Sequence, residues 1–92
     1  MAPEMLRGRP ADARADIWAL GVLIYEMVAG RRPFRGSTRY EVGAAILSDP
    51  AVPLPKTVPA SLRHVVWRCL AKRPADRYQS ASELAAALDD LE

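Results

Sequence analysis

The sequence predicts an all-α fold with about four main helices, one of which is central and apolar. Residues 16–30 include eleven apolar residues among fifteen, a density typical of a helix in a protein interior. Two Ser/Thr-x-x-Glu patterns, Thr38 with Glu41 and Ser80 with Glu83, are typical of helix starts. No segment alternates between apolar and polar residues as a half-buried strand does. Helices are therefore expected along the chain, without strands.

Length, charge and cysteine content exclude several classes of protein. The chain has 92 residues, enough for one small domain or for part of a larger one. Its formal net charge of +2 is too small to indicate a nucleic-acid partner, and the arginines between positions 31 and 39 are expected in a solvated loop. Cys69 is the only cysteine, which excludes an internal disulfide and a cysteine-rich metal site. A reducing, cytoplasmic location fits this cysteine usage.

The central helix is expected from Arg14 to Val28. Residues 1–13 precede it and contain two prolines and a glycine, so they are expected to form a loop with at most one helical turn. Gly30 suits a left-handed C-terminal cap, and Pro33 prevents the helix from continuing.

The apolar run of this helix is too short for a membrane span. Residues 17–29 cover about 20 Å as a helix, whereas the hydrocarbon core of a bilayer needs about 30 Å. Glu26 within the run disfavours a span further. We therefore expect a helix in a protein interior, in a chain without a membrane segment.

Three more helices are expected after Pro33. The first runs from Thr38 to Leu47, although Gly43 in its middle costs about 1 kcal/mol relative to alanine. Residues 50–59 hold four prolines and are expected to be an extended linker. The second helix runs from Ala60 to Ala71, and the third begins at Ser80. Apolar residues recur at helical spacing in these last two helices, at positions 62, 65, 66, 69 and 70 and at positions 84, 88 and 91.

Three motifs, in order and at matching distances, resemble a known family. They are "APE" at 2–4, "DIWALG" at 16–21 and "RCLAKRPADRYQSASEL" at 68–84. Together they resemble the C-terminal half of a bacterial eukaryotic-like (Hanks-type) serine/threonine protein kinase catalytic domain, from the APE motif onward. The resemblance covers residues 1–92, and implies a helical subdomain equivalent to the lower part of the kinase C-lobe. It assigns residues 1–13 to the end of the activation segment, 14–30 to the central helix and 31–92 to the remaining helices and loops.

The resemblance implies that Glu4 and Arg77 form a buried ion pair, which joins the activation segment to the base of the lobe. Read without the motifs, both are ordinary surface charges. The resemblance also implies that Asp16 anchors the catalytic loop by accepting hydrogen bonds from its backbone. Position alone gives Asp16 a simpler role, as a first-turn acid that the helix dipole favours.

Other positions of the central helix match family roles as well. Leu23 and Met27 match residues that support the hydrophobic column beneath the adenine of ATP, although they are equally ordinary core residues. Glu26 matches a glutamate that contacts a basic substrate side chain in some basophilic kinases, and its alternative is a charge paired within the fold, for example with Arg31. Gly21 costs about 1 kcal/mol in a helix interior, which a close backbone approach would explain.

Two residues with reactive side chains are expected to have structural roles. His64 has no second histidine or carboxylate cluster near it in the sequence, so neither a metal site nor a catalytic role is expected. Cys69 lies on an apolar stripe and is expected to be a small buried core residue.

The motifs that carry phosphoryl transfer in kinases do not occur in the 92 residues. There is no G-x-G-x-x-G, no H-R-D and no D-F-G, all of which precede A-P-E in the family. We therefore expect a kinase fragment that is inactive alone, with no cofactor of its own, from a truncated, split or mis-started gene. ATP and Mg²⁺ are implied only for a complete domain, and one expected partner is the missing N-terminal part of a kinase.

Two other functions remain open from the sequence. The chain could be a helical interaction module or dimerising remnant, which uses an exposed apolar face of the central helix once the residues that cover it are absent. A helix-turn-helix nucleic-acid binder is the third reading, but its arginines would have to lie on a recognition helix, whereas here they surround Pro33 and Gly36.

Overall fold

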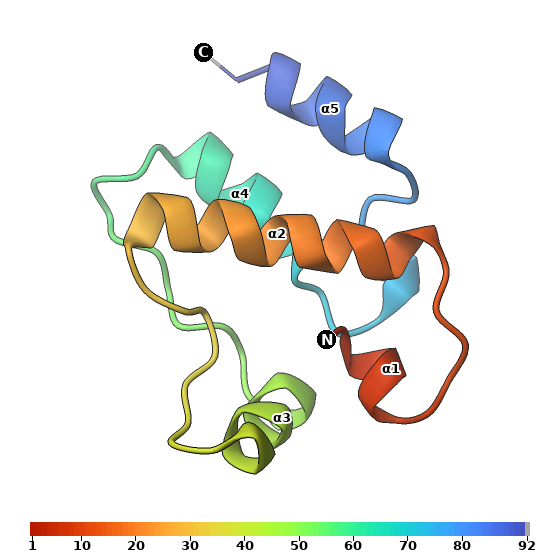
Figure 1. Ribbon diagram of the computed structural model, residues 1–92. Coiled ribbons are helices and arrows are strands. Elements are labelled where there is room, and N and C mark those ends of the chain that lie inside the picture. The colour runs from red at the N-terminus through yellow and green to blue at the C-terminus, as the bar shows by residue number, and fades with distance from the viewer. Residues whose placement is uncertain (92) are drawn as a thin grey trace.

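The computed structural model describes residues 1–91, which form five α-helices and one 3₁₀ turn without any strand (Figure 1). The all-α fold is therefore confirmed for these residues. The elements are α1 (Pro3–Leu6), α2 (Ala13–Ala29), α3 (Arg39–Ser48), α4 (Ala60–Cys69), η1 (Pro74–Asp76) and α5 (Ala81–Asp89). Within residues 1–91, no helix combines the length and the apolarity that crossing a membrane requires.

Helix α2 is the longest element and crosses the middle of the molecule, with α5 on one side and α1 and α3 on the other (Figure 1). It begins one residue before the predicted start, because the Asp12 side chain caps it by accepting from Arg14 N at 2.8 Å. It ends at Gly30, whose left-handed φ of 70° confirms the predicted C-terminal cap.

Both predicted capping patterns start helices. The Thr38 hydroxyl accepts from Glu41 N at 3.1 Å, and the Ser80 hydroxyl accepts from Glu83 N at 3.1 Å. In a standard capping box the glutamate side chain also accepts from the backbone N–H of the capping residue, and neither glutamate does so here. Glu41 accepts from Ser37 N rather than from Thr38 N, and the Glu83 carboxylate pairs with Arg68 at 3.2 Å.

The proline-rich stretch 50–59 contains no helix or strand, as predicted. It is held against α2 by Tyr25, whose hydroxyl donates to Val52 O. Helix α4 follows it and ends at Cys69, two residues before the predicted end. The helix cannot continue through Arg73, because the residue before Pro74 is driven out of the helical region, and Arg73 has an extended ψ of 127°.

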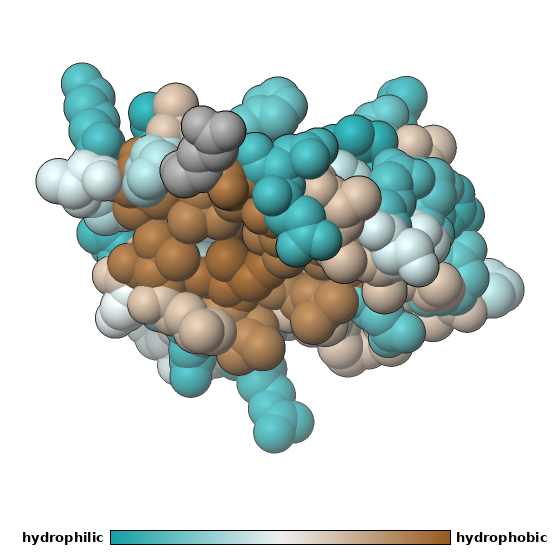
Figure 2. Space-filling view, turned by 90° about the horizontal axis from the view of Figure 1, so that it is seen from above, coloured by the Kyte–Doolittle hydropathy of each residue, from teal (hydrophilic) through white to brown (hydrophobic). Residues whose placement is uncertain are grey.

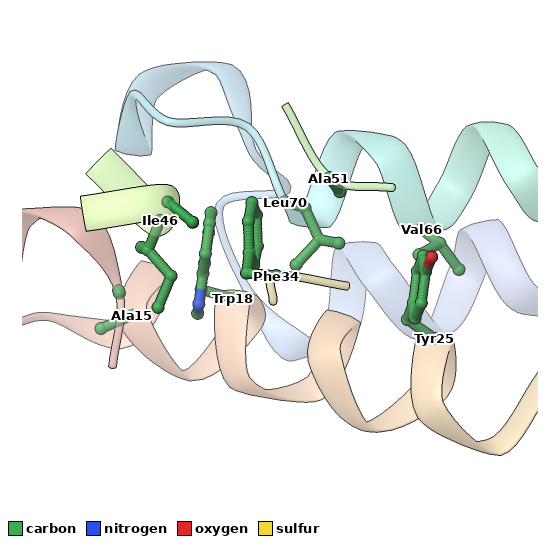
Figure 3. Close-up of a cluster of buried hydrophobic side chains, with 10 residues drawn as sticks. Ala15, Trp18, Tyr25, Phe34, Ile46, Ala51, Val66 and Leu70 are labelled. Atoms are coloured by element: carbon green, nitrogen blue, oxygen red, sulfur yellow. The ribbon is translucent and has the colours of Figure 1, made fainter. Parts of the chain in front are cut away.

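The core consists of two clusters that meet along one face of α2. In the first cluster the rings of Trp18 and Phe34 stack with centroids 5.5 Å apart and planes 12° apart (Figure 3). Ile46, Val66 and Leu70 complete this cluster from α3 and the end of α4. The second cluster lies between α2, α4 and α5, and its buried members are Ile17, Val65, Cys69, Tyr78 and Leu84.

The opposite face of α2 is exposed, although the helix is apolar on nearly all sides. Leu20, Leu23 and Met27 follow one another along this face, and we refer to them as the outer stripe. Leu23 is 53% exposed and Met27 is 75% exposed. The face of the molecule seen in Figure 2 carries a contiguous apolar area. None of the described elements covers the outer stripe, so residues 1–91 do not fully enclose the helix.

Candidate functional site

Glu4 and Arg77 form a two-point ion pair in the interior. They are 73 residues apart in sequence, yet Arg77 Nη1 lies 2.8 Å from Glu4 Oε2 and Nη2 lies 2.8 Å from Oε1. Glu4 is placed by α1, which Pro3 starts, and Arg77 follows the 3₁₀ turn that Pro74 starts. Arg77 is fully buried and Glu4 is nearly so. The pair therefore joins the first turn of the chain to the segment before α5.

Arg77 also binds three backbone carbonyls. Its Nε donates to Ala71 O at 2.8 Å, Nη1 donates to Arg14 O at 3.0 Å, and Nη2 donates to Lys72 O at 3.3 Å. A guanidinium has five N–H groups, and with the two bonds to Glu4 each of them has an acceptor. A buried charge is tolerated when it is paired and hydrogen-bonded in this way. Arg77 thus links α1, the start of α2 and the end of α4.

Electrostatics keep Glu4 ionised at neutral pH. The hydrogen bonds from Arg77 lower the pKa of the Glu4 carboxyl, and this effect exceeds the opposing effect of burial. The Arg77 guanidinium also lies 5.1 Å from the centroid of the Trp18 ring. The ion pair is thereby packed directly against the first core cluster.

Lys72 belongs to the same group of side chains, although no sequence pattern pointed to it. Its Nζ lies 4.2 Å from the centroid of the Phe34 ring, and burial lowers the pKa of this amine. Within residues 1–91 the ammonium group has no hydrogen-bond acceptor, and it interacts electrostatically with the aromatic face and with the charge of Asp49. Lys72 Nζ also lies 5.6 Å from the centroid of the Trp18 ring, so two cations, Arg77 and Lys72, lie close to the stacked Trp18 and Phe34 rings. Only the folded chain brings these four side chains together, which is why spacing alone could not reveal them.

Asp16 lies on the exposed side of α2, in its first turn. Leu20, Leu23 and Met27 follow Asp16 by four, seven and eleven residues, which places all four on one face of the helix. No hydrogen bond to the Asp16 carboxylate forms within residues 1–91. The structure thus places Asp16, Leu23 and Met27 along one face of α2, opposite the core that contacts the Glu4–Arg77 pair.

Glu26 is half-buried beside Phe34 and Arg32, with which it lines a shallow hollow. The three ion pairs of residues 1–91 do not include it. Arg31, the alternative partner considered above, instead donates from Nη2 to Pro53 O at 3.3 Å. The suggested pairing of Glu26 with Arg31 is therefore wrong, because the arginine reaches the proline-rich segment.

Cys69 and Gly21 lie in the packed interior, whereas His64 is exposed. Cys69 is fully buried, which raises the pKa of its thiol to about 11 and confirms its prediction as a core residue. A Cβ at Gly21 would lie 2.4 Å from Cys69 Cβ, so the close approach of α2 and α4 explains this glycine. His64 lies on the exposed side of α4.

Comparison with known proteins agrees with the motifs. The family model of the protein kinase domain matches residues 1–87. A probable serine/threonine-protein kinase PknB of Corynebacterium glutamicum is 44% identical over 98 residues, which cover 99% of this chain and 15% of that protein. A probable serine/threonine-protein kinase of Clostridium acetobutylicum is 37% identical over 99% of this chain and 14% of its own length. The serine/threonine-protein kinase PknA of Mycobacterium tuberculosis is 38% identical over 96% of this chain and 20% of its own length.

The matched region is thus a small part of each relative. The chain spans 14–20% of the length of these three proteins, although nearly all of it is matched. The match to the family model covers most of the chain, including Glu4, Asp16 and Arg77. The chain therefore belongs to the protein kinase domain family.

Proposed function

We propose that this chain forms the lower part of the C-lobe of a serine/threonine protein kinase and does not transfer phosphate by itself. The observation that carries the proposal is the Glu4–Arg77 pair, at 2.8 Å for both nitrogen–oxygen contacts. It fixes the A-P-E segment to the base of the helical unit. In this function the pair holds the end of the activation segment in place beneath the substrate.

The exposed side of α2 is the surface that the rest of the lobe covers in this proposal. The Asp16 carboxylate accepts hydrogen bonds from the backbone of a catalytic loop, and its exposure and lack of partners within residues 1–91 support this role. Leu23 and Met27 support the hydrophobic column beneath the adenine, and their exposures of 53% and 75% leave them free to be covered. Glu26 contacts a basic substrate side chain, consistent with its lack of an ion pair within residues 1–91.

One observation supports the absence of activity in the chain alone. The Gly-rich loop, H-R-D and D-F-G motifs do not occur in the sequence. The buried, unreactive Cys69 is also compatible with a reducing cytoplasm, the location we propose.

A phosphotransfer assay tests this proposal. The purified chain is incubated with Mg²⁺, radiolabelled ATP and a generic protein substrate, and ATP binding is measured by calorimetry. We expect neither binding nor incorporation of phosphate. Turnover that a substitution within residues 1–92 abolishes would overturn the proposal.

A second candidate function is self-association through the outer stripe. It is favoured by one observation, the row of exposed apolar side chains at Leu20, Leu23 and Met27. Sedimentation velocity of the chain and of the Leu23→Glu, Met27→Glu double variant tests it. A concentration-dependent dimer that the double variant abolishes supports this function, and a monomer at all concentrations contradicts it. The matched control is Tyr40→Glu, a change at an exposed aromatic residue on α3.

A further inference from the structure

Trp67 stands out on the surface of α4, away from the outer stripe. Its side chain is 53% exposed, whereas the other tryptophan, Trp18, is 1% exposed. An exposed tryptophan leaves a large apolar area in water, and such residues dominate the energetics of many protein interfaces. Trp67 is not needed for either core cluster of residues 1–91. Its exposure therefore suggests a contact outside the chain.

Two hollows flank Trp67, with volumes of about 380 and 400 Å³. Both include His64, Trp67 and Leu70 in their walls. The proline-rich segment forms part of the wall of the first hollow, through Pro53 and Leu54. None of the outer-stripe residues lines either hollow, so this surface is independent of the one that the proposed function uses.

The charges around the hollows favour an acidic occupant. Their walls contain three cations, Arg63, Arg68 and Lys72, against one carboxylate, Asp76. Arg68 is paired with Glu83 at 3.2 Å, and the Lys72 ammonium lies against Phe34.

Of the three cations, Arg63 is the one that has neither a carboxylate nor an aromatic partner within residues 1–91. Its Nε donates to Val58 O at 3.1 Å, and within residues 1–91 its two terminal amino groups have no acceptor. Arg63 and Trp67 are four residues apart on α4, so they are neighbours on one helix face. The Arg63 guanidinium can pair with one carboxylate of a ligand, and the exposed indole of Trp67 can pack against an apolar side chain next to that carboxylate.

We propose that the face of α4 around Trp67 docks an acidic peptide segment of another protein. An apolar side chain of the peptide enters the hollow between Trp67 and Leu54, and a neighbouring carboxylate pairs with Arg63. A nucleic acid fits less well, because it needs a row of cations along its phosphates, whereas Arg68 is paired with Glu83 and the Lys72 ammonium lies against Phe34. This inference does not depend on the chain being part of a kinase.

The test measures fluorescence anisotropy of a labelled twelve-residue peptide with the full 92-residue chain. The peptide alternates Glu and Ala around a central Phe-Leu pair, and its counterpart has Lys in place of Glu. We expect the Glu peptide to bind, to bind more weakly at 0.5 M than at 0.05 M NaCl, and to protect Trp67 from acrylamide quenching. Arg63→Glu and Trp67→Ala should each weaken binding at least about tenfold. The matched controls, Arg35→Glu and Tyr40→Ala, change an exposed arginine and an exposed aromatic residue elsewhere and should have no effect.

Four results would overturn the proposal. They are no binding of the Glu peptide up to millimolar concentration, equal binding of the Lys peptide, Trp67-dependent binding of a dT12 oligonucleotide instead of the peptide, and a dimer of this chain that Trp67→Ala dissociates. Because both side chains are exposed or half-buried, circular dichroism should show that the variants keep the helical fold. If the Trp67→Ala variant does not fold, the Arg63→Glu variant and the acrylamide quenching of the unmodified chain still show whether the peptide binds at this surface.

Discussion

Arg77 illustrates how a single residue can organise this chain. A fully buried guanidinium is costly unless every donor is satisfied, and here two carboxylate oxygens and three carbonyls satisfy it. These acceptors come from three separate parts of the chain. The cost of burying the charge is thus offset only when all three parts are in place, which couples their folding.

Removing the carboxylate should be strongly destabilising. Glu4→Gln keeps the size of the side chain but leaves the buried Arg77 charge without its counter-ion. We expect the free energy of unfolding to fall by about 3–5 kcal/mol, a large share of the stability of a small domain. Urea denaturation followed by circular dichroism measures it. The control is Asp12→Asn, which removes an exposed ion pair but keeps a good N-cap and should change little. A similar small change in both variants would contradict the role of the pair.

The same pair predicts a dependence of stability on pH. Arg77 holds the pKa of Glu4 below its ordinary value of 4.5, so the unfolded chain binds this proton more readily than the folded one. The contribution of the pair is complete above the ordinary pKa and is lost as pH falls through the lowered, folded pKa. Denaturation midpoints between pH 7 and pH 2 should therefore fall below about pH 4.5 in the unmodified chain. In Glu4→Gln this part of the fall should be absent, and an identical profile would contradict the assignment.

Residues differ in how far the sequence reveals them. The motif resemblance brought Glu4 and Arg77 together across 73 residues, which no local pattern could do. Lys72 was missed because its partner is an aromatic face, and a cation–π contact has no signature in spacing. The pairing of Glu26 with Arg31 was wrong because proximity in sequence says nothing about the carbonyl of Pro53.

At the scale of elements, helix starts were the most predictable feature. Thr38 and Ser80 cap α3 and α5 at the predicted positions, because capping depends on a side chain and an amide three residues apart. Asp12 was overlooked as the cap of α2, since the apolar run begins only five residues later, at Ile17. The end of α4 was placed two residues late, because the apolar stripe continues through Leu70 after the helix has ended.

The crossing of α2 and α4 gives a prediction about packing. Gly21→Ala would place a Cβ 2.4 Å from Cys69 Cβ, so the helices would have to separate. We expect a loss of about 1–3 kcal/mol despite the better helix propensity of alanine. Gly43→Ala is the matched control, because that glycine lies inside α3 with nothing within 4 Å of the added Cβ. It should raise stability by up to about 1 kcal/mol, and thermal melts of both variants compare them. A stabilising Gly21→Ala would show that the two helices are not tightly packed.

At the scale of the whole molecule, α2 is apolar on more of its surface than residues 1–91 bury. The sequence shows that the helix is apolar on nearly all sides, and the structure shows one side buried and the outer stripe exposed. Hydrophobic periodicity can predict that a helix face is apolar, but it cannot predict which protein segment packs against that face. That the rest of a kinase lobe packs against the outer stripe follows from the family assignment and the proposed function.

The central claim is that this chain supplies the base of a kinase lobe and lacks the apparatus of phosphoryl transfer. A chimera tests it most directly, in which residues 1–92 replace the matching segment of the Corynebacterium glutamicum kinase, with which they share 44% identity. Incorporation of radiolabelled phosphate into a protein substrate is measured for the chimera, for its Glu4→Gln variant and for the chain alone. The account predicts phosphorylation by the chimera, a marked loss in the variant and none by the chain alone. Phosphorylation by the chain alone, or a folded chimera that binds Mg-ATP without transferring phosphate, would contradict it.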